Sequence, residues 1–532
     1  MAYAGAEARY QVSNTLAQLR ATLGAAKFRD SLAVRALYSQ DVYRCGTTPL
    51  AVVSPTTVDE VVTAVRAATA ANVAIFVRGG GMSYTDAYLP DRERAIVLDL
   101  SRLNRVLSIS VEDLHATVEA GCTWADLDTA LAPHGLRAVF WGPMSGKLAT
   151  VGGGMSQGAA TFGSGRHGTS AAAALSFQLV LASGEILETS ASAHDGQAAF
   201  FRNYGPDLTA LFTGDAGALG VKTAVTLQLE PRPGHGDGLT FSFADFAALR
   251  QAVSRVAREG LATEVFGLEG ALARFVAGDQ SAEEAVKAWL AAGRAQAGAL
   301  QAVKQMSRMA WHGKRFLAGS PYLANFLTEA RDGAALRTAL DAIRQSVGDD
   351  GLEIANTMAA VTRATPFPAP MLLGPEGLRL LPLHGIFAPS QVEAFHNAFR
   401  AWCDTHRSHC DRLGIKVYTV FASCGASAFL YEPVIYWPDV WPALHRETMP
   451  AQMLAAWREP AANPDARALV ETMRLEIIEL MKQSGAAHLQ IGRAYPYLQD
   501  RDPIFLALLS AVKRAVDPHG LINPGALGLR PD

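Results

Sequence analysis

The chain contains 532 residues, enough for roughly three domains of ordinary size or for two large ones. Hydrophobic residues make up 49% of the sequence and charged residues 18%, a composition that predicts a globular chain and excludes extensive disorder. The 47 lysines and arginines are balanced by 50 aspartates and glutamates, which gives a net charge of -3. We therefore expect no nucleic-acid partner, because non-specific binding to phosphates needs a surplus of positive charge.

Cysteine usage and the first residues favour a reducing compartment. The five cysteines are few, odd in number and scattered, whereas secreted disulfide scaffolds carry dense, even sets. Glu7 stands where a signal peptide would carry lysine or arginine. No uninterrupted apolar run approaches the roughly 18 residues of a membrane-spanning helix. These features predict a cytoplasmic protein with no membrane span.

Short β-like runs alternate with helical stretches between about residues 50 and 230. Strands are predicted at Ala51–Val53, Ala74–Val77, Ala95–Leu98 and Ala116–Glu119, and helices at 57–71 and 123–134. Such alternation is typical of an α/β arrangement. Proline and glycine then cluster at 231–236, which predicts a linker.

The next region, about 237 to 480, mixes helices with strands and predicts a second, α+β domain. Helices are predicted at Leu249–Arg258 and Ala334–Val347, and strand-like runs at Leu380–Phe387 and Lys416–Phe421. The chain ends with one predicted helix, Ile504–Val516, and a turn-dense stretch at 517–525.

Three glycines follow the predicted strand at 74–77, in the sequence Arg78-Gly79-Gly80-Gly81-Met82-Ser83. Without side chains, such a loop can turn several backbone N–H groups toward one anion, as a pyrophosphate requires. The alternative is a plain tight turn, which glycine also favours. An NAD-type fingerprint is excluded because no G-x-G-x-x-G opens a helix there, and no G-x-x-x-x-G-K-[ST] phosphate loop occurs.

A second glycine-rich loop, 142–158, repeats this chemistry about seventy residues later, and a third glycine-rich stretch, 204–221, precedes the strand predicted at 225–229. Two such loops in one α/β region favour a single extended ligand that carries phosphate.

Five segments in this order (78–84, 118–124, 150–158, 207–221 and 517–525) resemble those of the vanillyl-alcohol oxidase and p-cresol methylhydroxylase flavoproteins, the PCMH-type FAD-binding family. The resemblance implies FAD and an α+β fold, in which an α+β cap domain over the flavin is inserted into a two-part FAD-binding domain. We expect the FAD-binding domain at 1–236, the cap or substrate domain at 237–480, and a return to the FAD domain at 481–532. These motifs are specific for fold and cofactor, and they leave the substrate open.

By the same resemblance, a set of residues in those loops would contact FAD. They are Arg78, Gly79, Gly80, Gly81, Met82, Ser83, Pro143, Thr150, Gly152, Gly153, Gly154, Ser156, Gly220, Val221 and Asn523.

The sequence departs from relatives that attach FAD covalently through the first glycine loop. Met82 replaces the histidine that follows the three glycines in those relatives, and a thioether is no nucleophile for that bond. The second loop has no cysteine for another linkage. His384 lies in a cap segment of the kind that carries a histidine linkage in some relatives, and it is the candidate for covalent attachment. The alternative is a buried histidine with one hydrogen-bond partner.

Catalytic candidates also follow from the resemblance. Gln157 occupies the position of an acid in phenol-oxidising relatives, and a neutral amide cannot act as that base. Arg493 could clamp a substrate carboxylate and Tyr495 could polarise a hydroxyl. Tyr84 lies close to the position of a tyrosine in phenol-binding relatives.

The leading hypothesis is an FAD-dependent oxidoreductase that passes a hydride from a para-substituted phenol or aromatic alcohol to flavin N5. The alternative substrate is a 2-hydroxy acid or another alcohol, with Arg493 as carboxylate clamp. A flavin-binding protein without catalysis is a further alternative, suggested by the missing acid and the missing loop histidine. The electron acceptor is left open between oxygen and a protein or quinone, and the resemblance allows a homodimer.

Cys403, His406 and Cys410 share one face of a predicted helix, which raises a metal hypothesis. Ligands on a single helix rarely complete a tetrahedral site, and no second ligand pair is evident. We therefore expect no metal.

Overall fold

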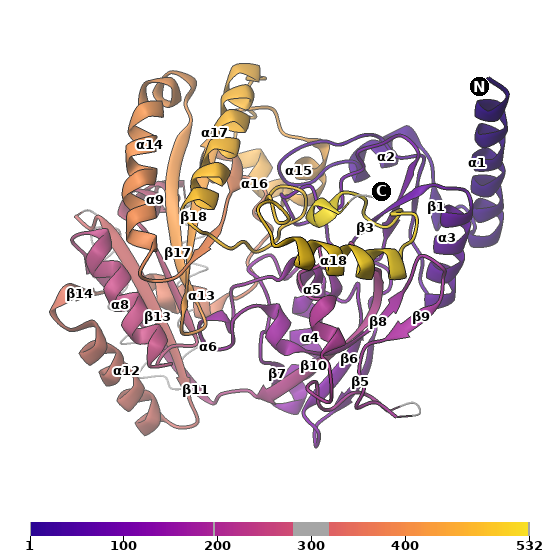
Figure 1. The fold of residues 1–532 in the computed structure, drawn as a ribbon. Helices are drawn as coiled ribbons and strands as arrows, with labels where there is room; N and C mark the ends of the chain where they lie inside the picture. Colours follow the sequence, from indigo (N-terminus) through magenta and orange to yellow (C-terminus); the bar gives the residue numbers. More distant parts are fainter. Residues whose placement is uncertain (1, 195–196, 280–318, 530–532) are drawn as a thin grey trace. The chain divides into compact units, whose positions relative to one another are not determined.

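The computed structural model describes residues 2–194, 197–279 and 319–529. Two compact units divide the chain (Figure 1): unit 1 comprises 1–159, 170–231 and 489–532, and unit 2 comprises 160–169 and 232–488. The units differ from the expected domain bounds in three places, the first of which is the boundary at 231/232 where 236/237 was expected. Residues 160–169 group with unit 2 although they lie within the sequence of the first domain, and the chain returns to unit 1 at 489.

Unit 1 contains a four-stranded sheet in the order β1-β2-β4-β3, with β2, β4 and β3 parallel and β1 antiparallel to β2. The strands are β1 (Phe28–Arg29), β2 (Ala51–Val53), β3 (Ala74–Arg78) and β4 (Ala95–Asp99). All residues of β2 and β4 are buried, as expected for parallel strands covered on both faces. Helix α3 (Val58–Ala70) packs its apolar stripe, which includes Val61 and Val65, against this sheet.

A second sheet of unit 1 has six strands and is antiparallel throughout, in the order β5-β6-β10-β8-β9 with β7 paired to β10. Its strands are β5 (Val106–Ser110), β6 (His115–Glu119), β7 (Leu136–Ala138), β8 (Ala174–Val180), β9 (Ile186–Glu188) and β10 (Val221–Pro231). Strand β10 is the organising element because it pairs with β6, β7 and β8.

The remaining helices of unit 1 connect or flank these sheets. They are α1 (Ala2–Leu23), α2 (Leu32–Tyr38), α4 (Trp124–Leu131), α5 (Val151–Gln157), α7 (Leu208–Leu211) and α18 (Pro503–Val516), with the short 3-10 helices η1 (Ala132–His134), η2 (Ser170–Ala173) and η6 (Ala526–Gly528). Side-chain oxygens of Thr57, Thr123 and Asp502 cap the first turns of α3, α4 and α18.

Unit 2 is built on one antiparallel sheet of eight strands, in the order β14-β11-β13-β12-β17-β18-β15, with β16 also paired to β18. The strands are β11 (His235–Phe243), β12 (Glu264–Glu269), β13 (Tyr322–Ala330), β14 (Gly351–Ile354), β15 (Arg379–Pro382), β16 (Gly385–Phe387), β17 (Lys416–Cys424) and β18 (Ala428–Trp437). The strand predicted at Leu380–Phe387 is thus divided into two. Pro382, which has no backbone N–H to donate to a ladder, ends the first part.

The helices of unit 2 are α6 (Ser164–His167), α8 (Phe246–Arg258), α9 (Gly270–Asp279), α12 (Gly333–Val347), α13 (Thr357–Ala364), α14 (Val392–Leu413), α15 (Ala443–Thr448), α16 (Ala451–Ala456) and α17 (Pro464–Gln483), with the 3-10 helices η4 (Gly348–Asp350) and η5 (Pro375–Gly377). Helices α8, α12 and α14 cover one face of the sheet (Figure 1). On that face, Phe246 of α8 lies 3.9 Å from His396 of α14, ring to ring, and both contact Tyr431 of β18. This aromatic cluster is the core of unit 2.

The opposite face of this sheet is covered less completely. Strand alternation places Phe266, Val420, Leu430, Glu432 and Ile386 on it, and we call it the Glu432 face. Helices α9 and α13 pack over part of it, where Phe275 contacts Tyr418 and Tyr436, and Met358 contacts Asn325. Phe266, Val420, Ile386 and Glu432 themselves are only half-buried.

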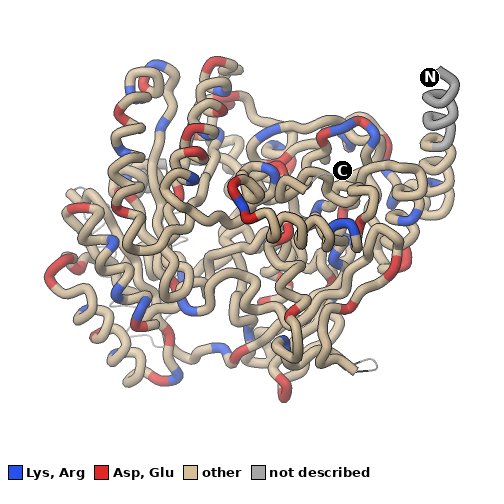
Figure 2. Tube along the Cα trace, viewed as in Figure 1, with Lys and Arg blue, Asp and Glu red and all other residues tan. Residues whose placement is uncertain are grey.

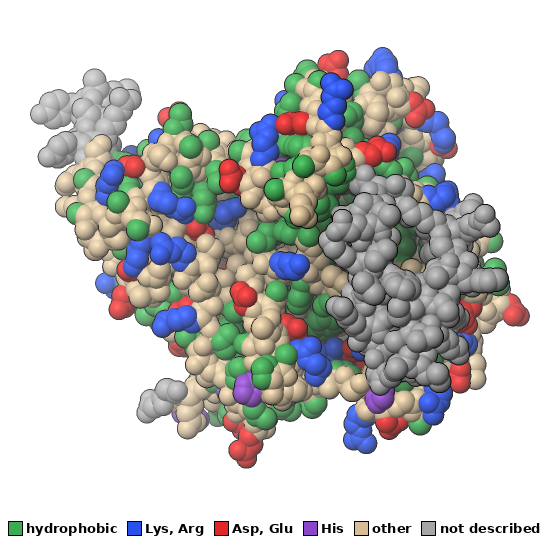
Figure 3. All heavy atoms as spheres, turned by 180° about the vertical axis from the view of Figure 1, so that it is seen from behind, with side chains coloured by type: hydrophobic (Ala, Val, Ile, Leu, Met, Phe, Trp, Pro, Cys, Tyr) green, Lys and Arg blue, Asp and Glu red, His purple; other side chains and the backbone are tan. Residues whose placement is uncertain are grey.

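Charged side chains of both signs are interspersed along the described chain (Figure 2) and on the face shown in Figure 3, where neither sign forms an extended patch. This distribution agrees with the balanced composition. Among the described residues no helix is both long and apolar enough to cross a membrane.

Candidate functional site

The first glycine loop leaves β3 after Arg78 and presents unpaired backbone donors. Within the described residues, none of the N–H groups of Gly79, Gly80, Gly81 and Met82 has a hydrogen-bond acceptor. Gly81 has a φ of 72°, a conformation that glycine adopts without strain. Because backbone N–H groups that are shielded from water nearly always have an acceptor, four consecutive free donors fit an anionic ligand such as a pyrophosphate.

Glycine is required in this loop because the second glycine loop lies directly against it. A Cβ on Gly79 would lie 2.3 Å from Oγ1 of Thr150, and a Cβ on Gly80 would lie 1.8 Å from the carbonyl oxygen of Leu148. Any side chain at these positions would push the two loops apart. The guanidinium of Arg78 fills the space beside Gly81 and stacks over Tyr38, with 4.5 Å from Cζ to the ring centroid.

The second loop, at α5, uses its glycines differently. The backbone N–H groups of Val151, Gly152 and Gly153 already donate to Cys122 O, Ala120 O and Thr150 Oγ1 at 2.8, 2.9 and 3.2 Å. A Cβ on Gly152 would lie 2.6 Å from the Cβ of Ala120, and a Cβ on Gly154 would lie 2.8 Å from Trp124 Nε1. These glycines therefore allow α5 to pack closely on its neighbours, and free anion-binding donors are a property of the first loop.

One face of α5 remains available to a ligand. Gly153, Ser156 and Gln157 are half-buried, while Gly152, Gly154 and Met155 are buried. Oε1 of Gln157 is inaccessible to solvent and accepts no hydrogen bond within the described residues. The unpaired amide oxygen of Gln157, next to the half-buried face of α5, is therefore a second feature that suits a bound ligand, provided that the ligand carries a hydrogen-bond donor.

The C-terminal segment closes this part of unit 1. Oδ1 of Asn523 accepts a hydrogen bond from the N–H of Val77 at 2.8 Å, and its Nδ2 donates to the carbonyl of Ala216 at 2.9 Å. Asn523 thereby connects β3 with the 214–220 stretch. Gly220 and Val221 follow that stretch at the start of β10, and Pro143 begins the turn that leads to the second loop, with Gly146 N–H donating to its carbonyl at 2.9 Å.

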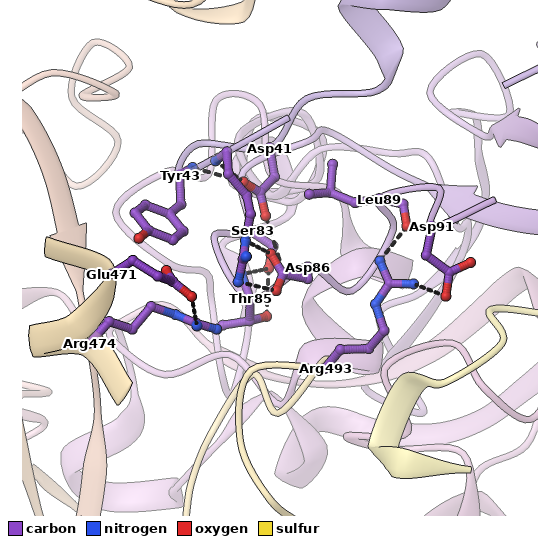
Figure 4. A network of polar contacts seen from close by, with 11 residues as sticks. Asp41, Tyr43, Ser83, Thr85, Asp86, Leu89, Asp91, Glu471, Arg474 and Arg493 are labelled. Carbon is purple, nitrogen blue, oxygen red and sulfur yellow. Dashed lines mark hydrogen bonds and ion pairs between the residues drawn. The ribbon is translucent and has the colours of Figure 1, made fainter. Parts of the chain in front are cut away.

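A buried acidic pair lies next to the first loop (Figure 4). Oδ2 of Asp41 accepts the backbone N–H of Asp86 at 3.1 Å, and Arg44 binds both carboxylate oxygens of Asp86 at 2.8 and 2.7 Å. Burial, together with the nearby carboxyl of Asp86, raises the pKa of Asp41 to about 7. Asp41 and Asp86 were not among the predicted site residues, since no motif in the sequence distinguishes them from surface charges.

Arg493 is held by groups of unit 1 itself (Figure 4). Its Nη2 donates to the carbonyl of Leu89, its Nη1 donates to the carbonyl of Pro524 at 3.5 Å, and Nη1 lies 3.3 Å from Oδ2 of Asp91. These three contacts hold the guanidinium of Arg493 in place within unit 1. Tyr495, two residues later, is buried, with 3% of its surface exposed.

Two predicted residues are connected by one that the sequence analysis missed. The backbone N–H of Gln490 donates to the carbonyl of Gln157 at 2.8 Å, and its side-chain amide donates to the hydroxyl of Tyr84 at 3.4 Å. Tyr84 and Gln157 are therefore neighbours of the same residue. Gln490 carries no motif, so only the folded chain reveals this role.

In unit 2, His384 lies between β15 and β16 and is 2% exposed. Its carbonyl accepts a hydrogen bond from Nδ1 of His488 at 2.7 Å. Burial, followed by the neighbouring His488, lowers the pKa of His384 to about 3, so its imidazole is neutral at physiological pH. Glu432 of β18 was also missed, although a glutamate within the run Leu430-Tyr431-Glu432-Pro433-Val434 is the signal that could have identified it. Burial raises the pKa of Glu432 to about 7.

The predicted metal-ligand helix is α14, where each candidate has another contact. His406 Nε2 lies 3.0 Å from a carboxylate oxygen of Glu476, and Cys410 Sγ lies 3.9 Å from Met473 Sδ. Burial raises the pKa of Cys403 to about 12. No group of three or more potential metal ligands occurs in the described part of the chain.

Comparison with known proteins agrees with this site. Residues 49–190, which include both glycine loops, match the family described as FAD binding domain. The chain is 33% identical over 222 residues to an uncharacterized FAD-linked oxidoreductase of Mycobacterium tuberculosis, covering 41% of this chain and 45% of that protein. It is 30% identical over 242 residues to the glycolate oxidase subunit GlcD of Bacillus subtilis, covering 45% of this chain and 49% of that protein. The matches thus span about half the length of these curated relatives.

The fold is similar to that of p-cresol methylhydroxylase, with a TM-score of 0.71 at 16% identity over 98% of this chain and 97% of that chain. The free donors of the first loop, the glycine face of α5 and the matched domain define a flavoprotein that binds FAD. The match to the FAD binding domain and the likeness in fold support the predicted resemblance to the PCMH-type FAD-binding flavoproteins. The predicted α+β fold class and the predicted cofactor are therefore confirmed, and the predicted family is supported.

Proposed function

We propose that the protein is an FAD-dependent oxidoreductase that removes a hydride from a carbon of a small hydroxylated substrate. When bound, FAD supplies the acceptor for that hydride. The observation that carries this proposal is the row of free N–H donors from Gly79 to Met82 inside the matched FAD-binding domain. Gly79 to Met82 would hold the pyrophosphate, and Gly153, Ser156 and Gln157 would line the rest of the cofactor site.

For the substrate we favour a para-substituted phenol or an aromatic alcohol. The half-buried part of the Glu432 face is mainly apolar, which suits an aromatic ring. Lys416, on the same face, lies 3.1 Å from Glu376 and 4.0 Å from the ring centroid of Phe275, so its charge is already engaged. Arg493 likewise has Leu89, Pro524 and Asp91 as partners. These contacts favour a neutral substrate over a carboxylate.

A 2-hydroxy acid is the second candidate, with Arg493 as its carboxylate clamp. It is supported by the 30% identity to a protein named glycolate oxidase subunit GlcD. That similarity covers 45% of this chain and 49% of that protein.

The first experiment is the visible spectrum of the purified protein before and after acid precipitation. Flavin bands are expected in the native sample, and their absence from a folded, FAD-supplemented protein would overturn the proposal. Colour in the supernatant indicates dissociable FAD. Colour in the pellet indicates a covalent bond, which His384→Ala should abolish.

The substrate class is tested by mixing the oxidised protein anaerobically with para-substituted phenols, aromatic alcohols, glycolate and D-lactate. Bleaching of the flavin by the aromatic compounds supports the first candidate, and bleaching by the acids alone supports the second. If none of these substrates reduces a flavin that dithionite does reduce, the remaining hypothesis is a flavin-binding protein without catalysis. Reoxidation by oxygen, a quinone or an electron-carrier protein then identifies the acceptor.

A further inference from the structure

The first glycine loop is fixed at its downstream end by Ser83. Upstream, the loop leaves β3, which is held by its ladder with β4. Within the described residues the N–H groups of 79–82 have no acceptor, and Ser83 is the next residue whose backbone makes a hydrogen bond. Its carbonyl accepts the N–H of Val42 at 3.2 Å and the hydroxyl of Tyr88 at 3.3 Å. The course of the loop therefore depends on the segment that contains Val42.

That segment, residues 40–45, is a tight turn whose two ends pair with each other, and we call it the Asp41 turn. Oδ1 of Asp41 accepts the backbone N–H groups of Tyr43 and Arg44, both at 2.8 Å. Its Oδ2 accepts the N–H of Asp86 at 3.1 Å. One carboxylate thus shapes the turn with one oxygen and ties it with the other to the chain just past the glycine loop.

The chain at 83–86 needs such support (Figure 4). Asp86 has a φ of 61°, a left-handed conformation that a residue other than glycine keeps only where its surroundings hold it. Arg44 of the Asp41 turn binds both oxygens of the Asp86 side chain. The carbonyl of Thr85 accepts the N–H of Arg493 at 2.9 Å. All of these segments belong to unit 1, so the support lies within one compact body.

The carboxylate of Asp41 is costly to keep in this place. Asp41 is 1% exposed, and within the described residues no lysine or arginine forms an ion pair with it, because Arg44 pairs with Asp86. Burial, followed by the carboxyl of Asp86, raises the pKa of Asp41 to about 7. An asparagine would serve the N–H groups of the turn without a buried charge. Only a carboxylate offers a second acceptor, and that acceptor is used by Asp86.

We propose that Asp41 is a positioning residue for FAD, which holds the downstream end of the first glycine loop so that the N–H groups of 79–82 stay directed at one pyrophosphate. The inference rests on the cofactor site proposed above. Asp41 acts through the backbone of Asp86 and Ser83, because direct contact between a carboxylate and a pyrophosphate would be repulsive. Without this tie the four donors must be ordered when FAD binds, and that cost is taken from the binding free energy.

The test measures ligand binding by the full-length apoprotein at pH 8, above the pKa of about 7 of Asp41. Asp41→Asn keeps an acceptor for the turn and turns an amide N–H toward the N–H of Asp86. The FAD dissociation constant, from fluorescence titration, should rise by about tenfold or more. ADP, which carries the same diphosphate and no flavin, should lose affinity by the same factor when it competes with FAD.

The matched control is Asp439→Asn in unit 2. Asp439 is also fully buried, and it accepts the N–H groups of Val440 at 2.9 Å and Asn463 at 3.0 Å, so it too joins two segments of chain. Neither segment belongs to the first glycine loop. Asp439→Asn should lower the melting temperature and leave the affinities for FAD and ADP unchanged, which separates a positioning role from a general loss of stability.

A second variant decides the question if Asp41→Asn does not fold. Arg44→Lys, at a half-buried residue, leaves Asp41 intact and loses the two-pronged contact with Asp86, so both dissociation constants should rise about threefold. Wild-type affinity for FAD and ADP in a folded Asp41→Asn variant, or in Arg44→Lys where Asp41→Asn does not fold, would overturn the inference alone. A folded wild-type protein that binds no FAD would overturn the proposed function together with the inference.

Discussion

The side chain of Asn523 accepts a hydrogen bond from the backbone of Val77 across 446 residues of sequence. Its backbone also joins β3, because its N–H donates to the carbonyl of Ile75 at 2.8 Å while Ile75 N–H donates to Leu521 O at the same distance. The last residues of the chain therefore form a short parallel bridge beside the strand that ends in the first glycine loop. The position of that loop depends on the C-terminus.

Replacing Asn523 with Ala should weaken FAD binding. The substitution leaves Val77 N–H and Ala216 O without partners, and each lost hydrogen bond costs about 1 kcal/mol. We expect a lower melting temperature and an FAD dissociation constant raised about tenfold, measured by fluorescence titration of apoprotein. Asn523→Asp keeps an acceptor for Val77 and loses only the donor to Ala216, so it should fall between the two. Equal FAD affinity in all three proteins would contradict this role.

Gly80→Ala should prevent FAD binding more completely. Its Cβ would lie 1.8 Å from the backbone oxygen of Leu148, so the first glycine loop must move and its free N–H groups must change direction. The matched control is Gly333→Ala at the start of α12, where a Cβ meets only Arg337 Nη1 at 3.6 Å. The FAD content per protein, from the absorbance ratio of flavin to protein, should fall in Gly80→Ala alone. Stoichiometric FAD in Gly80→Ala would show that the loop does not carry the pyrophosphate.

Arg493→Lys distinguishes a structural arginine from a substrate clamp. A lysine cannot reach Leu89 O, Pro524 O and Asp91 in one geometry, so we expect a loss of roughly 2 kcal/mol in the free energy of unfolding. KM should then change equally for neutral alcohols and for 2-hydroxy acids. A rise in KM confined to the acids, with stability unchanged, would instead identify Arg493 as the clamp. Arg501→Lys, at an exposed arginine nearby in sequence, is the control.

The parts of the site that are built from glycine residues could be predicted from the sequence. Gly79, Gly80 and Gly81 are visible in the sequence as a place where backbone approaches a ligand, because no other residue type allows it. The sequence did not distinguish this loop from the loop at Gly152, whose donors are consumed by Cys122 and Ala120. The difference between the two loops depends on which strands lie behind each loop in the folded chain. A single sequence does not show that packing.

The residues that the sequence analysis missed are those defined by long-range pairing. Glu432 stands opposite His384 only because of the register between β18 and the β15–β16 strands. Gln490 connects Tyr84 with Gln157 through bonds that span more than 300 residues, and the fold alone brings these segments together. The strand predicted at Leu380–Phe387 was placed correctly, but its division at Pro382 depends on a missing N–H donor at the sheet edge.

Unit 2 should lose stability in mild acid through the buried histidine of its aromatic core. His396 Nδ1 lies 2.8 Å from the hydroxyl of Tyr431, and its ring stacks on Phe246. Burial, followed by Arg400, lowers the pKa of His396 to about 4, whereas an unfolded histidine titrates near 6.5. Between these two values the unfolded state binds more protons than the folded state, so stability falls as the pH falls from about 6.5 toward 4. His384 and His488 act in the same direction.

For His396 alone, this difference amounts to about 2 kcal/mol at pH 5. Amide hydrogen exchange of α8 and α14, followed by mass spectrometry at pH 7.5 and pH 5 after correction for intrinsic exchange rates, should show lower protection at the acidic pH. His396→Gln removes the titrating group and should reduce that pH dependence. His409→Gln, on the exposed side of the same helix, should leave it unchanged. If His396→Gln is as sensitive to acid as the wild type, the acid sensitivity of unit 2 does not arise from this imidazole.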